Sequence, residues 1–210
     1  MTTVFSFVFP FLLMMALCQK TMILLGKRST GWIPTIIIAS ASALMVTLPI
    51  SGLTTGRWLI SLYANPSIPL TALLFSWVLK NAFQINLLDM RAIQTCRGFS
   101  ILAGASLFPM ALGAGAFDPY PAGWHFSWLF VILLGVTLVL LFLKNRFSMV
   151  LLTTILAYDL HLLESGNLWD YLVDPILVLV SIAGLTITIA KLWIGKRPGK
   201  VGYAINLNRT

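Results

Sequence analysis

The chain has 210 residues, of which 59% are hydrophobic and only 10% are charged, and its mean hydropathy is +0.93. A soluble domain carries charge on roughly 25% of its residues because its surface faces water, so a soluble globule, a disordered chain and a coiled coil are excluded. The net charge of +8 would suggest nucleic acid in a soluble protein. In a membrane protein, however, basic residues gather in cytoplasmic loops, and we expect no nucleic-acid partner.

Seven apolar stretches reach or approach the roughly 20 residues that a helix needs to cross a bilayer. In chain order they are 4–25, 32–53, 66–87, 98–117, 125–143, 147–163 and 175–194. We therefore predict an all-α fold in which residues 1–210 form a single integral membrane domain, a multi-pass bundle of transmembrane helices. The sixth stretch is the shortest and the weakest candidate for a full crossing. A basic tail follows over residues 195–210.

Two prolines mark predicted helix starts. Asn65 precedes Pro66, and Asp174 precedes Pro175. A proline suits the first helical position, and Asn or Asp directly before it can cap the helix. These pairs predict the starts of the third and the seventh helix.

The basic residues predict the orientation of the bundle. With the N-terminus outside and seven alternating spans, all 14 lysines and arginines except Arg57 fall at or beyond the cytoplasmic ends. The cytoplasmic set is Lys20, Lys27, Arg28, Lys80, Arg91, Arg97, Lys144, Arg146, Lys191, Lys196, Arg197, Lys200 and Arg209. Such an asymmetry in short loops follows the positive-inside rule. We expect a bacterial inner membrane, with the C-terminus in the cytoplasm and the lipid bilayer as the first partner.

The acidic residues gather at the opposite, outer end. Only Asp89 lies inside, whereas Asp118, Asp159, Glu164, Asp170 and Asp174 lie outside. If the sixth helix continues to residue 163, His161 and Glu164 share one face, and Asp159 lies near the outer membrane boundary, where ionisable groups are costly and often functional.

Two interpretations of this segment stay open. In the first, Asp159, His161, Glu164 and Asp170 are catalytic residues in general acid–base chemistry, or belong to a proton relay or cation site. In the second, water contact alone makes the loop polar, Asp174 caps the last helix, and the helix dipole favours Asp170. We favour the second interpretation.

Two further groups are candidate binding residues. His125 could join His161 and the outer carboxylates, together with Asp174, but no metal-ligand spacing is present, and we predict no metal site and no cofactor. Lys80, Asn81 and Gln84 share a helical face and could line a cytoplasmic cavity. Alternatively, Lys80 extends to the headgroups and the amides bond within the bundle, which is the interpretation we favour.

Small residues in the fourth stretch predict close helix contacts. Ser100 with Gly104, and Ala111 with Gly115, are pairs of small residues four positions apart. Such pairs let two backbones approach each other in a membrane. We expect Gly104 and Gly115 to be positions where a large side chain does not fit.

No motif in the chain specifies a reaction, so three functions are expected in descending order. The first is an integral membrane subunit or accessory protein without catalysis of its own, which helps to transport or assemble a substrate with other membrane proteins. The second is an enzyme that acts at the outer face on a lipid or lipid-linked substrate. The third is a transporter of small solutes, which would need more charge near the bilayer midplane than this chain offers.

Overall fold

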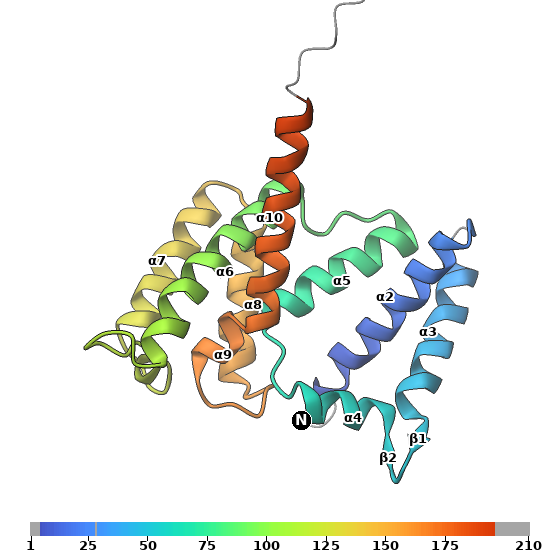
Figure 1. Ribbon diagram of the computed structural model, residues 1–210, viewed down its shortest axis with the longest axis horizontal. Coiled ribbons are helices and arrows are strands. Elements are labelled where there is room, and N and C mark those ends of the chain that lie inside the picture. The colour runs from blue at the N-terminus through green and yellow to red at the C-terminus, as the bar shows by residue number, and fades with distance from the viewer. Residues whose placement is uncertain (1–4, 28, 196–210) are drawn as a thin grey trace, which may run out of the picture.

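The computed structural model describes residues 5–27 and 29–195, and it is all-α apart from one short hairpin (Figure 1). The elements are α2 (Val8–Leu24), α3 (Trp32–Thr47), β1 (Pro49–Ile50), β2 (Leu53–Thr54), α4 (Thr55–Leu62), α5 (Ile68–Phe83), α6 (Met90–Ala111), η1 (Tyr120–Gly123), α7 (Trp128–Phe142), α8 (Phe147–Asp159), α9 (Leu168–Leu172) and α10 (Pro175–Gly195). Arg28, Lys196, Arg197, Lys200 and Arg209, with the tail from residue 196 and the first four residues, lie outside the described residues.

The long helices form a bundle in which successive helices run in opposite directions (Figure 1). On one side of the view, α2 pairs with α3, and α5 crosses the bundle obliquely between α2 and α8. On the other side lie α6, α7 and α8, and α10 packs along α6. The short elements α4, η1 and α9 gather at one end, together with the hairpin.

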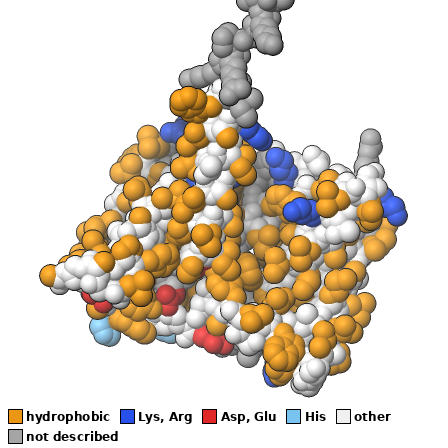
Figure 2. Space-filling model, viewed as in Figure 1, with side chains coloured by type: hydrophobic (Ala, Val, Ile, Leu, Met, Phe, Trp, Pro, Cys, Tyr) orange, Lys and Arg blue, Asp and Glu red, His pale blue; other side chains and the backbone are white. Residues whose placement is uncertain are grey.

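Charge separates the two ends of this bundle. Lysines and arginines gather at the upper edge of Figure 2, acidic side chains and histidines gather at the lower edge, and hydrophobic side chains cover the sides between them. The lower edge, formed by α4, η1, α9 and the loops around them, is called the acidic end here. The upper edge, where α2, α5, α7 and α10 finish, is called the basic end. Arg57 belongs to α4 and is therefore the basic residue of the acidic end.

The helix boundaries correct several predicted spans. The second span was predicted to reach residue 53, but α3 ends at Thr47. Leu48 precedes Pro49 and has an extended ψ of 123°, because the ring of a proline disfavours helical backbone at the residue before it. The chain then forms the antiparallel hairpin of β1 and β2.

The fourth span is displaced toward the N-terminus. It was predicted over 98–117, whereas α6 covers Met90–Ala111. The Asp89 side chain accepts a hydrogen bond from Ala92 N (3.2 Å) and so caps α6. The helix therefore includes Arg91 and Arg97, which were predicted to precede it. The helix ends because Gly113 has a φ of +90°, and Ala114 N donates to the Pro109 carbonyl, as in a Schellman motif.

Three more spans are shorter than predicted. The third, 66–87, is α5, and Ser67 caps it instead of Asn65 by accepting from Leu70 N (3.4 Å). The fifth, 125–143, begins at Trp128 because Ser127 caps α7. The sixth, 147–163, ends at Asp159. The last predicted start is confirmed: α10 begins at Pro175, directly after Asp174.

One helical stretch is long and apolar enough, by length and composition, to cross a membrane. Among the described residues it is Leu168–Trp193, which covers α9 and all but the last two residues of α10, and an 18-residue window within it has a mean hydropathy of 2.2. The other apolar helices of the described residues have 10–17 residues, fewer than the roughly 20 of a complete crossing. They are α2, α3, α5, α7 and α8.

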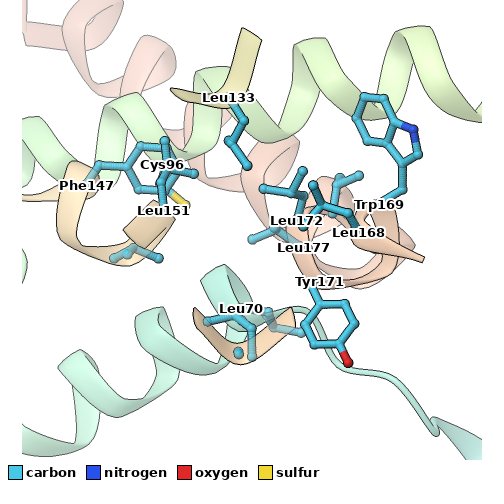
Figure 3. Packing of buried hydrophobic residues seen from close by; sticks show 14 of the residues in the cluster. Leu70, Cys96, Leu133, Phe147, Leu151, Leu168, Trp169, Tyr171, Leu172 and Leu177 are labelled. Carbon is cyan, nitrogen blue, oxygen red and sulfur yellow. The ribbon is translucent and has the colours of Figure 1, made fainter. Parts of the chain in front are cut away.

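The main hydrophobic core is built from residues of all six helices from α5 to α10. Leu133 of α7 points toward Leu168, Leu172 and Leu177, which come from α9 and α10 (Figure 3). At the other side of the same view, Phe147 of α8 is fully buried, and its ring packs on Phe99 of α6 with centroids 5.6 Å apart. A second, smaller cluster joins α2, α3 and α5. The core therefore holds α9 and the loops of the acidic end against the long helices.

Glycine packing confirms one of the two predicted contacts in the fourth span. A Cβ at Gly104 would lie within 2.5 Å of a Val178 methyl group, so α6 approaches α10 closely at this point. The expectation for Gly115 is wrong. Gly115 lies beyond the end of α6, has a φ of +128° and faces open space, because α6 ends four residues before it.

Candidate functional site

Asp174 lies where the acidic end meets the long helices. Its Oδ1 accepts from Leu177 N (2.8 Å) and caps α10, while its Oδ2 accepts from Ser67 N (3.0 Å) at the start of α5. The side chain is buried, with 4% of its surface exposed. This one carboxylate therefore satisfies backbone donors at the N-termini of two helices, which otherwise have no partner within the helix. The predicted cap is confirmed, and Ser67 is a partner that the sequence did not reveal.

The phenol of Tyr63 lies beside the same carboxylate. Burial raises the pKa of Tyr63, and the Asp174 carboxylate beside it raises the pKa further. The buried Tyr63 hydroxyl makes no hydrogen bond with the described residues. The phenol therefore stays protonated at neutral pH, and the pair adds no second charge to this part of the acidic end.

Asp170 is a hydrogen-bond acceptor for two hydroxyl groups, one of them 50 positions away in the sequence. Tyr120 Oη donates to both of its oxygens (3.3 and 3.2 Å), and Ser165 Oγ donates to Oδ2. Burial, the Asp170 charge and this hydrogen bond raise the pKa of Tyr120 to about 12. Asp170 also lies in the first turn of α9, where a negative charge is favoured by the helix dipole. Its geometry is that of a carboxylate which fastens η1 to α9.

Asn167 completes the connection between η1 and α9. Its Oδ1 accepts from Trp169 N (2.9 Å), and its Nδ2 donates to the Tyr120 carbonyl (3.0 Å). Asn167 is fully buried, and a Cβ at Gly123 would overlap its amide. Trp169 Nε1 donates to the Pro119 carbonyl (3.0 Å). The loop before α7 is thus held to α9 by the side chains of Asn167 and Trp169, and no side chain larger than that of glycine fits at position 123.

Tyr171 fixes the segment between α8 and α9 from inside. Its ring is fully buried and its hydroxyl points away from the leucine cluster (Figure 3). The hydroxyl accepts from Leu163 N (3.1 Å) and donates to the Ser165 carbonyl (3.1 Å). Backbone groups in a loop need such partners when they are buried. Residues 163–165 therefore follow a defined path across the acidic end.

The remaining candidates, Asp159, His161 and Glu164, do not form one face of a helix. The prediction that His161 and Glu164 share a helical face is wrong, because α8 ends at Asp159 and His161 has a φ of +51°. Leu162 N donates to the Ala157 carbonyl and His161 N to that of Tyr158, which together make a Schellman motif. A residue with positive φ reverses the chain direction, so the positions after it leave the helical face.

The side chains of this trio are exposed. The His161 ring stacks on Tyr158, with centroids 6.3 Å apart, and its Nδ1 lies 3.0 Å from the Asp159 carbonyl. Within the described residues, neither the Asp159 nor the Glu164 carboxylate makes a hydrogen bond or an ion pair. The structure thus separates the acidic segment into two groups: Asp170 and Asp174 are bonded to the fold, whereas Asp159, His161 and Glu164 face outward.

The other predicted binding residues lie apart from this segment or on a surface. His125 is exposed in the loop before α7. Within residues 5–27 and 29–195, no three His, Cys, Asp or Glu side chains are grouped closely enough to hold a metal ion. At the basic end, Asn81 Nδ2 donates to the Trp77 carbonyl of its own helix (2.9 Å), and Lys80 and Gln84 are exposed. Gln84 adopts a left-handed conformation that ends α5.

Comparison of the chain with family models, with curated proteins and with solved structures gives no match. Function is therefore inferred from the residues themselves. Of the residues that build the acidic end, Ser67 was recognisable as a helix cap before an apolar run that contains Pro69. Tyr120 carried no comparable signal, because its partner Asp170 is distant in the sequence. Asn167 is a local cap of α9, but its bond to the Tyr120 carbonyl is equally distant.

Proposed function

We propose that the chain is an integral membrane subunit or accessory protein without catalysis of its own, which helps other membrane proteins to transport or assemble a substrate. The observation that carries this proposal is what the side chains of the acidic residues contact. Asp170 and Asp174 are bonded to groups that hold η1, α5, α9 and α10 together, so they serve the architecture. No carboxylate remains in a sheltered position where a substrate proton could be transferred, within the part of the chain that the structure describes.

The surface of the bundle supports the membrane part of the proposal. On α7, Val131, Ile132 and Phe142 are exposed by 60%, 56% and 85%, and comparable apolar residues are exposed on α3 and α10. Monomeric soluble proteins rarely expose apolar patches of this extent. In our proposal the apolar sides face lipid or partner helices, and seven helices cross the bilayer with the acidic end outside. The shorter helices then require local thinning of the bilayer or flanking residues that reach the headgroups.

An enzyme acting on a lipid at the outer face is the second candidate, and one observation favours it. His161 adopts positive φ without being glycine, and such backbone conformations cluster at functional sites. Its exposed ring, with Asp159 and Glu164 nearby in sequence, would be accessible to a substrate headgroup. The two candidates make opposite predictions for this trio.

Complementation of a deletion strain separates the two functions. The variant Asp159→Asn/His161→Ala/Glu164→Gln is compared with Asp118→Asn/His125→Ala, which changes exposed residues of the same end. Under our proposal both variants restore function at normal protein levels. Loss of function confined to the trio variant, with membrane insertion and stability unchanged, would establish the enzyme instead.

Cysteine labelling tests the topology in the same cells, after Cys18 and Cys96 are replaced by serine. Asp118→Cys and Gly166→Cys should react with a membrane-impermeant maleimide from outside, and Arg91→Cys and Lys144→Cys should react only after lysis. Gly166 is chosen because it is exposed, whereas the neighbouring Asn167 is buried. External labelling at residue 144, or release of the chain by alkaline carbonate, would overturn the membrane topology.

A further inference from the structure

A groove runs along the side of the bundle between α2, α5 and α8. Its volume is about 1070 Å³. Along α8 its lining extends from Arg146, directly before the helix, to Leu160, directly after it, which is about 20 Å by helix rise. It therefore extends from the basic end toward the acidic end, over more than the roughly 15 Å of hydrocarbon in one leaflet.

The walls of the groove are lined mainly by apolar side chains, and its two threonine hydroxyl groups offer no free proton to an occupant. Thr71 and Thr153 both line it. Thr71 Oγ1 donates to the Ser67 carbonyl (3.1 Å), and Thr153 Oγ1 donates to the Met149 carbonyl (2.8 Å). Their hydroxyl protons are thus used within their own helices. A polar solute would lose its hydration here without gaining partners, whereas a hydrocarbon chain would not.

The basic end of the groove has a different chemistry. Arg146 is the charged residue of its lining among the residues that the structure describes. Arg146 Nη1 donates to the carbonyls of Asn86 (2.7 Å) and Leu87 (3.2 Å), which holds the guanidinium in place. Its Nε and Nη2 groups make no hydrogen bond, and its charge no ion pair, with the described residues. A guanidinium held in this way can bind a phosphate through two parallel hydrogen bonds.

We propose that this groove binds one anionic phospholipid, with an acyl chain along α8 and its phosphate at Arg146. The proposal rests on the membrane location proposed above. The charge fits, because the cytoplasmic leaflet carries the anionic lipids. A partner helix would also cover the apolar walls, but its apolar side chains would leave the guanidinium of Arg146 without an anionic partner. Lipid binding at this position would give the chain a defined preference for its membrane environment.

Native mass spectrometry of the purified full-length chain tests lipid binding directly. After delipidation in detergent, phosphatidylglycerol and phosphatidylcholine of the same acyl composition are titrated separately. We expect one retained phosphatidylglycerol per chain, bound about tenfold more tightly than phosphatidylcholine. Equal affinity for both lipids, or equal binding of glycerol 3-phosphate without acyl chains, would overturn the proposal.

A matched pair of threonine substitutions tests the position. Thr153→Phe fills the groove from an exposed residue, whereas Thr186→Phe adds the same ring to α10. Both threonines are exposed and both donate to the carbonyl four residues earlier in their helices. Thr153→Phe should weaken phosphatidylglycerol binding at least about tenfold, and Thr186→Phe should not change it. Equal binding by both variants would place the lipid elsewhere and refute the groove as its site.

Arg146→Gln should abolish the preference for phosphatidylglycerol while acyl-chain binding persists, and Arg146→Lys should restore part of it. Lys191→Gln removes a charge from the same end, outside the groove, and should have no effect. If Arg146→Gln proves unstable, the threonine pair still decides the question. The two proposals fail separately: release by alkaline carbonate defeats the membrane location, whereas an integrated chain that binds lipid regardless of Thr153→Phe defeats only the groove.

Discussion

At the acidic end, carboxylate and amide side chains that are buried or half-buried connect segments far apart in the sequence. Asp174 joins α10 to the start of α5 across 107 positions, and Asp170 joins α9 to Tyr120 across 50. At the basic end, Lys20, Lys80 and Lys144 are exposed. Long-range polar contacts exist there too, such as those from Asn145 Nδ2 to Thr95 Oγ1 (2.8 Å) and from Arg97 Nη1 to the Gly184 carbonyl (3.3 Å), but the three lysines make none of them. Asp170 and Asp174 of the acidic end are therefore structural, whereas these three lysines of the basic end are available to partners.

The largest test of this comparison replaces the aspartate that caps a helix at each end. Asp174→Ala should lower the free energy of unfolding in detergent by about 2–4 kcal/mol, because two buried N–H groups lose their acceptor. Asp89→Ala at the basic end should cost only about 1 kcal/mol, as an ordinary cap does. Asp174→Asn should fall between them, since an amide retains one acceptor oxygen. Equal losses for Asp174→Ala and Asp89→Ala would remove the distinction between the two ends.

Gly123→Ala should be the next most damaging change. The added methyl group would displace the buried Asn167 amide, and overpacking of this kind costs about 1–3 kcal/mol. Gly135→Ala in α7, where nothing lies within 4 Å, should instead stabilise the helix by about 0.5–1 kcal/mol. Thermal unfolding of both variants gives the comparison. A neutral Gly123→Ala would mean that η1 is not fixed to α9.

Tyr120→Phe removes one hydrogen bond from the acidic end and should cost about 1 kcal/mol at neutral pH. The pKa of this phenol is raised from 10.0 to about 12, so the stabilisation is complete below pH 10 and is lost as the pH rises through the folded-state value. The difference in Tm between the native protein and Tyr120→Phe should therefore shrink between pH 10 and pH 12. A constant difference would argue against the contact with Asp170.

Both ends contain a helix that finishes on a non-glycine residue with positive φ. Lys144 follows α7 at the basic end with a φ of +52°, and His161 follows α8 at the acidic end with a φ of +51°. Glycine relieves the strain of this conformation, so Lys144→Gly and His161→Gly should each raise stability by up to about 1 kcal/mol. His161 should gain less because its ring stacks on Tyr158. A loss of stability at His161 would identify the ring as part of the fold.

The smallest effect is expected for the exposed residues of the acidic end. Asp159→Asn and Glu164→Gln should each change the free energy of unfolding by no more than about 0.5 kcal/mol, as is usual at exposed positions without partners. Chemical denaturation in detergent measures the change. A larger loss in either variant would show that the division of the acidic residues into bonded and exposed groups is incorrect.

Several features of the fold could be predicted from local sequence. Long apolar stretches indicate helices, and Asp174 before Pro175 indicates the start of α10 because a cap and its helix are adjacent in the chain. The ends of α6 and α8 were not predicted, and at α3 the proline that ends the helix, Pro49, lies inside the apolar stretch. Each ends through backbone geometry at one or two residues, such as His161, whereas hydropathy averages over many residues and continues past such a point.

By itself, the sequence determined the all-α class and the helix cap at Asp174. It also determined the separation of acidic from basic side chains, because turns between alternating helices carry the charges that apolar helices exclude. Only the tertiary structure decided which acidic side chains are hydrogen-bonded to the fold. Asp170 and Glu164 lie six positions apart in the same polar segment, but only Asp170 meets the hydroxyl of Tyr120. That difference arises from contacts between elements distant in the chain, which local composition cannot predict.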